Sequence, residues 1–289
     1  MFVIGFFVFL LAYYGVQRPK SFTVSAFTEH LRVETVSLGA FDWTLTDYQL
    51  CIPLKEGEQA TQTDFNPKCA SELFHFHGIG RETTVRWTDD YVLEFRSFDP
   101  DFLYIYISRH GQEQSVTIDG NVVTDGSILF IPRSHERLVL PILGRITLGE
   151  IPYRSDAMIL LSGDYEIRQQ LFPRLTSRVV SSGSFFKGDK VSIAGLWSGD
   201  IDARVFLTSA ASEGTGFDIV ATTSPHYGDL LLTRVGGQPT RLVVGFADRL
   251  KADPLPAAFA TLLGLLATSI ALVNNFFGAS AGRAKKKSN

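Results

Sequence analysis

Two histidines in the stretch FHFHG, His75 and His77, have the residue type and spacing that most directly suggest metal chemistry. On a β-strand, residues two apart lie on one face, so both imidazoles could bind one zinc ion. A zinc site needs a third and usually a fourth ligand. Four candidates exist, none at a spacing that ties it to the pair: Asp89, Asp90, His110 and His135. The alternative, which the pattern favours, is an ordinary half-buried strand with Phe74 and Phe76 on its apolar face.

The only two cysteines, Cys51 and Cys69, flank a polar stretch, KEGEQATQTDFNPK. If this part of the chain lies outside the cytoplasm, an oxidising compartment favours a disulfide between them. Such a bridge would contribute about 3 kcal/mol through the loop that it closes. The alternative is a pair of separate buried thiols.

Several motifs for catalysis and nucleotide binding are missing. The chain contains no H-E-x-x-H motif, no P-loop and no dinucleotide-binding fingerprint. The sequence therefore predicts no catalytic residue and no cofactor. Two carboxylates that meet from distant positions, as in glycosidases, leave no signature in one sequence.

The middle of the chain has the alternation and the turns of short β-strands. In residues 41–45 the apolar side chains alternate, and in FLYIYIS the aliphatic residues 103, 105 and 107 point away from Tyr104 and Tyr106. Asp119-Gly120 and Asp125-Gly126 are typical of type I′ hairpin turns. The predicted fold is mainly β, an antiparallel β-sandwich or meander between two transmembrane helices.

The predicted body divides into a first half, residues 20–132, and a second half, residues 140–250. Two prolines and several charged residues lie at this boundary. One continuous sandwich is the alternative. Helical signal is scarce: residues 25–32 and 166–172 are the two short segments that could form helices.

Both ends of the sequence are apolar. Residues 1–17 carry no charge, and residues 255–277 are long enough to span a bilayer as a helix. We expect an N-terminal transmembrane anchor or uncleaved signal at 1–17; a cleaved signal peptide or a start further upstream are alternatives. A basic tail, residues 278–289, follows the second span and is typical of a cytoplasmic flank.

Small residues recur along one stripe of the second span. Ala260, Gly264 and Thr268 are four apart, a spacing that lets membrane helices approach closely. The stripe predicts self-association or pairing with another membrane protein. Ordinary transmembrane composition is the alternative.

The charge of the whole chain argues against a nucleic-acid partner. The 289 residues carry 27 basic and 30 acidic side chains, a net charge of -3.

Long domains are translocated largely regardless of their charge, so we place the body outside the cytoplasm, most simply at a bacterial inner membrane. The bilayer and other membrane proteins are the expected partners.

These features predict a two-pass membrane protein with a β-rich extracytoplasmic body. We expect it to act as a structural, assembly or binding component of an envelope complex. The alternatives are a membrane-tethered hydrolase with a site of scattered histidine and aspartate residues, and a glycan- or ligand-binding β-sandwich.

Overall fold

The computed structural model describes most of the predicted body and part of the second apolar segment. The described residues are 19–35, 41–55, 69, 73–77, 82–88, 91–109, 115–133, 138–152, 157–170, 177–194, 203–209, 215–223, 229–252, 261–262, 264–265 and 267–272.

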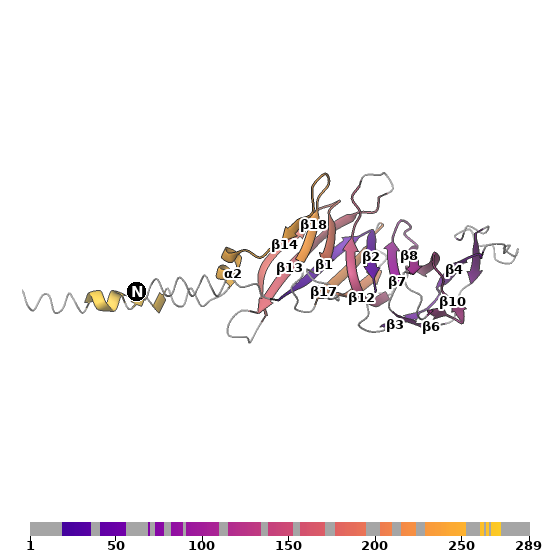
Figure 1. Ribbon diagram of the computed structural model, residues 1–289, viewed down its shortest axis with the longest axis horizontal. Coiled ribbons are helices and arrows are strands. Elements are labelled where there is room, and N and C mark those ends of the chain that lie inside the picture. Colours follow the sequence, from indigo (N-terminus) through magenta and orange to yellow (C-terminus); the bar gives the residue numbers. More distant parts are fainter. Residues whose placement is uncertain are drawn as a thin grey trace, which may run out of the picture.

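The body is built almost entirely of β-strands (Figure 1). The strands are β1 (Lys20–Thr28), β2 (His30–Glu34), β3 (Phe41–Leu45), β4 (Gln49–Pro53), β5 (Phe74–His77), β6 (Thr83–Trp87), β7 (Tyr91–Arg96), β8 (Phe102–Arg109), β9 (Thr117–Ile118), β10 (Asn121–Val122), β11 (Ser127–Pro132), β12 (Leu138–Leu148), β13 (Leu160–Gln170), β14 (Ser177–Phe185), β15 (Lys190–Ala194), β16 (Ala203–Ser209), β17 (Phe217–Thr223), β18 (Asp229–Thr233) and β19 (Thr240–Leu242). A short helix, α2 (Phe246–Ala252), follows them.

Most of these strands belong to one large antiparallel sheet. Its main path runs β14-β13-β1-β17-β16-β12-β2-β7-β8-β11-β4-β5, and β15, β18 and β19 extend from β12. The remaining strands form two small pairs, β3 with β6 and β9 with β10. Strands of both predicted halves pair directly, since β1 pairs with β13 and β17. The prediction of a mainly β, antiparallel fold is confirmed.

Two strand segments carry the sheet around a corner. Only Glu29 separates β1, which pairs with β13 and β17, from β2, which pairs with β7 and β12. Strand β12 pairs with β16 over residues 138–144 and with β2 over residues 145–148. Strands that switch partners in this way form the corners between packed layers.

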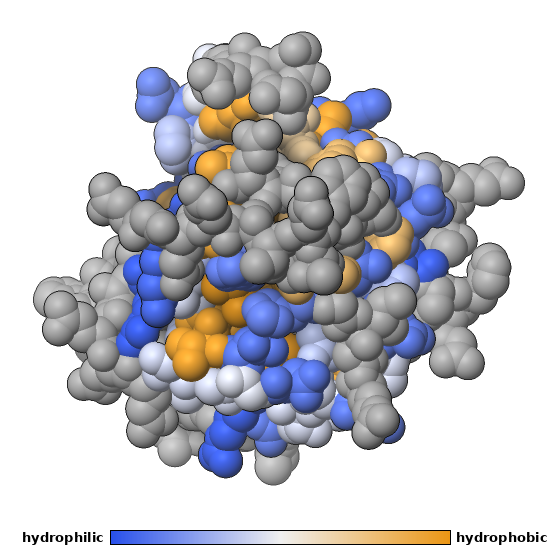
Figure 2. Space-filling model, turned by 90° about the vertical axis from the view of Figure 1, so that its right-hand side faces the viewer, coloured by the Kyte–Doolittle hydropathy of each residue, from blue (hydrophilic) through white to orange (hydrophobic). Residues whose placement is uncertain are grey.

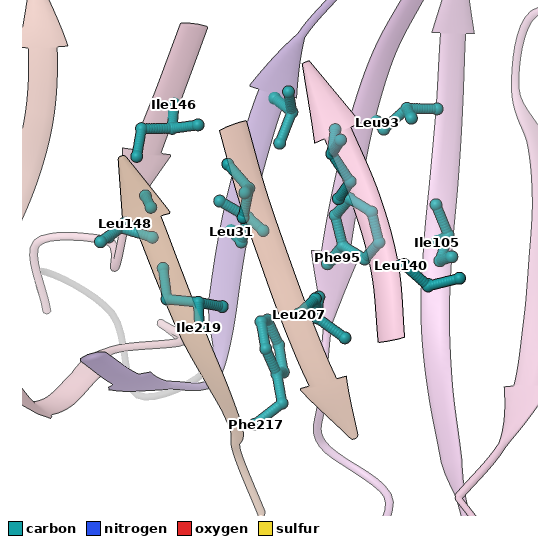
Figure 3. Close-up of a cluster of buried hydrophobic side chains, with 14 of the residues drawn as sticks. Leu31, Leu93, Phe95, Ile105, Leu140, Ile146, Leu148, Leu207, Phe217 and Ile219 are labelled. Atoms are coloured by element: carbon teal, nitrogen blue, oxygen red, sulfur yellow. The ribbon is translucent and has the colours of Figure 1, made fainter. Parts of the chain in front are cut away.

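The main core lies between the layers that these corners join. Figure 3 shows side chains from β2, β7, β8, β12, β16 and β17 directed toward one another, among them Leu31, Phe95, Ile105, Leu207 and Phe217. All five are buried. The alternation predicted for β8 is confirmed, because residues 103, 105 and 107 enter this core while Tyr104 joins a second cluster on the opposite face.

The small β3–β6 pair closes the core with aromatic side chains. Trp43 and Trp87 meet edge to face, with ring centroids 4.9 Å apart, and both are buried. Trp43 donates its indole N–H to the carbonyl of Pro141 over 2.9 Å, which ties β3 to β12.

Two local predictions are wrong. Residues 25–28 belong to β1, residues 30–32 to β2 and residues 166–170 to β13, so neither segment is a helix. The alternating burial of β1 shows why: every second residue packs into the body, and this burial outweighs helix propensity.

The two Asp-Gly turns have different outcomes. Asp119 and Gly120 both have positive φ and join β9 to β10, as predicted. Asp125-Gly126 instead precedes β11, which pairs with β8 and β4.

The membrane spans remain predictions. Residues 1–17 lie outside the described residues, and 255–277 is described only at helical positions 261–262, 264–265 and 267–272. No helix among the described residues is both long and apolar enough to cross a membrane.

Candidate functional site

A cluster of ionisable side chains gathers on the outer face of the sheet, beside the corner between β1 and β2. We call His30, Glu94, Arg96 and Glu150 the corner cluster. Its members come from the start of β2, from β7 and from the segment after β12.

The corner itself places His30. The Thr28 hydroxyl donates to the His30 carbonyl over 2.9 Å and accepts the His30 N–H over 3.2 Å. Glu29, between the two strands, is held as well. Its carboxylate accepts hydrogen bonds from the Thr215 hydroxyl over 2.7 Å and from the Ile159 N–H over 3.2 Å. These bonds fix the backbone at His30, the first residue of β2, and so define where its imidazole lies. His30 is buried.

Glu94 and Arg96 reach His30 from the neighbouring strand β7. His30 pairs with Arg96 in the register, and Glu94 shares the face of Arg96 because the two are two residues apart. His30 Nε2 lies 3.0 Å from Glu94 Oε1, and Arg96 donates from Nε to the same oxygen over 2.8 Å and from Nη2 as well. The Arg96 guanidinium also lies over the Tyr106 ring, 5.1 Å from its centroid.

Glu150 arrives from the end of β12. The Gly149 N–H donates to the His30 carbonyl over 3.0 Å, and Gly149 has a φ of 67°, a conformation that glycine adopts without strain. A Cβ at Gly149 would lie 2.7 Å from the Leu160 nitrogen, so the turn also needs glycine for space. The Glu150 carboxylate then lies 3.7 Å from His30 Nε2.

These contacts hold Glu94 as an anion. They lower the pKa of Glu94 to about 2, and the hydrogen bond with His30 is the largest cause of this shift. Burial would raise that pKa, but the hydrogen bonds from His30 and Arg96 outweigh it. Burial lowers the pKa of Arg96, but the hydrogen bond and charge of Glu94 outweigh it and leave that pKa above its ordinary value. Burial raises the pKa of Tyr106 beside them.

The corner cluster also contains a set of possible metal ligands. One atom each from His30, Glu94 and Glu150 lie within 4.8 Å of one another, and within the described part of the chain no other three histidine, cysteine or carboxylate groups do so. Ile151, the next residue after Glu150, lines an open pocket of about 400 Å³ together with Lys190, Ser192 and Thr233.

The predicted histidine pair lies elsewhere, on β5 at one end of the sheet. His75 pairs with Ile52 and His77 with Leu50, and both histidines are half-buried. Phe74 and Phe76 pack against a cluster that contains Cys51 and Cys69, on the apolar face that was expected for them. The structure brings no described carboxylate or histidine to this pair as a third ligand, and the four candidates at 89, 90, 110 and 135 lie outside the described residues.

The predicted disulfide is confirmed. Cys51 on β4 is bonded to Cys69, with Cα atoms 6.0 Å apart, and both residues are buried. The bridge packs beside Tyr104 and Phe130 in the second cluster, on the face opposite the main core.

The predicted small-residue stripe is described in part. Ala260 lies outside the described residues, while Gly264 and Thr268 are helical, and the Thr268 hydroxyl donates to the Gly264 carbonyl over 2.9 Å. A Cβ at Gly264 would have no heavy atom within 4 Å. The role of the stripe in helix pairing remains a prediction.

Sequence reasoning missed the corner cluster. His30 fell in a segment that the sequence allowed to be a short helix, and its partners lie far along the chain in β7 and after β12. The alternation of apolar and polar residues along β1 was the one signal that favoured a strand over a helix in this segment. Comparison of the chain with protein-family models, curated proteins and solved structures gave no match.

Proposed function

We propose that this protein is a two-pass membrane protein whose β-rich body lies outside the cytoplasm and serves as a structural, assembly or binding component of an envelope complex. A bacterial inner membrane is the proposed location. The antiparallel sandwich would stand between two transmembrane helices at residues 1–17 and 255–277.

The observation that carries the proposal is that the chain enters and leaves the body at the same end. Lys20 on β1 pairs with Gln169 on β13, and Gln169 pairs with Arg178 on β14. Arg178 donates to the carbonyl of Ala252, the last residue of α2, over 3.4 Å. Four neighbouring residues thus connect the first strand to α2, as expected for a domain whose N-terminal and C-terminal anchors enter the same bilayer.

The helical residues after α2 support an apolar environment for this segment. Leu262, Leu265, Ile270 and Leu272 are all more than half exposed. Exposed apolar side chains on a helix outside the body are costly in water and suit lipid or another apolar helix.

The disulfide supports the extracytoplasmic location. In Figure 1, α2 lies at one end of the elongated body and β4, which carries Cys51, lies toward the other. A disulfide persists in an oxidising compartment and is rare in the cytosol.

Thiol labelling of spheroplasts tests the location. Val122, on β10, is 48% exposed, so Val122→Cys would report on the body, and Ser288→Cys on the tail. The native pair is buried and bonded, so the wild-type chain serves as the unlabelled control. We expect an impermeant maleimide to label Val122→Cys in intact spheroplasts and Ser288→Cys only after lysis. The reverse pattern would place the body in the cytoplasm and contradict the proposal.

The assembly role has a separate test. We expect the chain, extracted in mild detergent, to give a protein mass by light scattering well above its 32.0 kDa monomer. A lone monomer that retains no envelope protein would contradict this part of the proposal.

A further inference from the structure

We propose that His30, Glu94 and Glu150 bind a divalent transition-metal ion of the zinc type. His30 would bind through Nε2, and the two glutamates through carboxylate oxygens. This site is distinct from the predicted pair at His75 and His77 and does not depend on the membrane anchors.

The spacing of the three ligand atoms fits a shared ion. Zinc lies about 2.0–2.2 Å from nitrogen and oxygen ligands, which places two ligands of a tetrahedral site about 3.4 Å apart. The Nε2 atom of His30 lies 3.0 Å from Glu94 and 3.7 Å from Glu150, on either side of that value. A small shift of the carboxylates would bring all three atoms around one ion.

The three ligands are held by different backbone segments that are fixed to one another. The His30 side chain is 5% exposed, and His30 itself pairs with Arg96 on β7. The hydrogen bond from Gly149 to the His30 carbonyl fixes the segment that carries Glu150. A preformed site loses little conformational entropy when it binds an ion.

One local feature favours metal binding and another opposes it. Arg96 bonds to Glu94 Oε1, an arrangement that resembles the outer hydrogen bonds that orient metal-ligating carboxylates. His30 Nδ1 has no hydrogen-bond partner among the described residues, and a metal at Nε2 would place a proton there. One unsatisfied N–H costs little beside the metal–ligand bonds that two anionic carboxylates and an imidazole make with a dication.

Zinc binding by the full chain in detergent tests the proposal, with a purification tag that lacks histidine. We expect wild type to bind one zinc ion in competition with a chromophoric chelator, and Glu150→Gln to weaken binding at least about tenfold. Glu34→Gln is the matched control, because Glu34 lies on the same strand as His30 but its carboxylate contacts Arg32, outside the cluster. The unfolding temperature of each variant without zinc checks that it folds.

Cobalt gives a second readout of the site. We expect the visible absorption of tetrahedral cobalt in wild type and in a His75→Gln/His77→Gln variant, but not in Glu150→Gln. The proposal would be overturned if wild type bound no zinc, if Glu150→Gln bound it like wild type, or if the histidine double variant lost it instead.

Discussion

At the scale of single residues, Glu94 links stability to pH. Its pKa is about 2 in the folded protein against an ordinary 4.5. A carboxylate whose pKa is lower in the folded than in the unfolded protein stabilises the fold. This contribution is complete when the pH is above the unfolded pKa, and it is lost as the pH falls from about 4.5 toward 2. The glutamate side chain is 22% exposed, so solvent screens the interaction only in part.

We therefore expect Glu94→Gln to lower the free energy of unfolding by about 1–3 kcal/mol at pH 7. The difference from wild type should shrink between pH 4.5 and pH 2.5. Guanidinium unfolding followed by tryptophan fluorescence at each pH measures both quantities.

Glu166→Gln provides the control for this experiment. Glu166 and Arg168 repeat the Glu-x-Arg contact on β13, but at side chains 42% and 45% exposed. We expect a loss below about 0.5 kcal/mol at pH 7. Equal pH profiles for the two variants would show that the corner cluster does not hold Glu94 as an anion.

At the scale of elements, the crossing of β12 over the corner depends on Gly144. This residue ends the pairing with β16, and Arg145 begins the pairing with β2. A Cβ at Gly144 would lie 2.3 Å from the Glu34 carbonyl oxygen and 2.8 Å from Val33 Cγ1. The first contact is with backbone that is itself paired in the sheet, so it cannot move away cheaply.

We expect Gly144→Ala to destabilise the body by about 1–3 kcal/mol, because the added methyl group overpacks the crossing. Thermal unfolding of the full chain measures the loss. Ser25→Ala, at an exposed position on β1, should change stability by less than about 0.5 kcal/mol. If both variants unfold alike, the corner is looser than the close approach implies.

The elements differ in how far sequence predicts them. The alternation at Phe41, Trp43 and Leu45 and the Asp119-Gly120 turn are local, and both were predicted correctly. The pairing of β1 with β13 and β17 brings together residues far apart in the chain, and no local pattern encodes it. The corner cluster exists only because of such pairing. The disulfide could be predicted because the chain has only two cysteines and the body was expected in an oxidising compartment, where a bridge between them is favoured.

At the scale of the whole molecule, the shared end of β1 and α2 would make the two proposed anchors, residues 1–17 and 255–277, equivalent. The pairing from Lys20 to Gln169 to Arg178, and the bond from Arg178 to Ala252, place Lys20 and Ala252 at the same end of the body. Neither connection alone would then be needed to hold the body at the membrane. A body held by two anchors should be released only when both are cut.

We expect this behaviour from site-specific protease sites inserted after residue 18 and after residue 253. In membranes that carry either single insertion, cleavage should leave the body in the membrane pellet. With both insertions, cleavage should release a disulfide-bonded fragment to the supernatant. Release after the cut at 253 alone would mean that residues 1–17 do not anchor the mature chain, as in a cleaved signal peptide. Retention after both cuts would mean that the β-rich body itself binds the membrane or a partner there, and that the apolar ends are not what holds it.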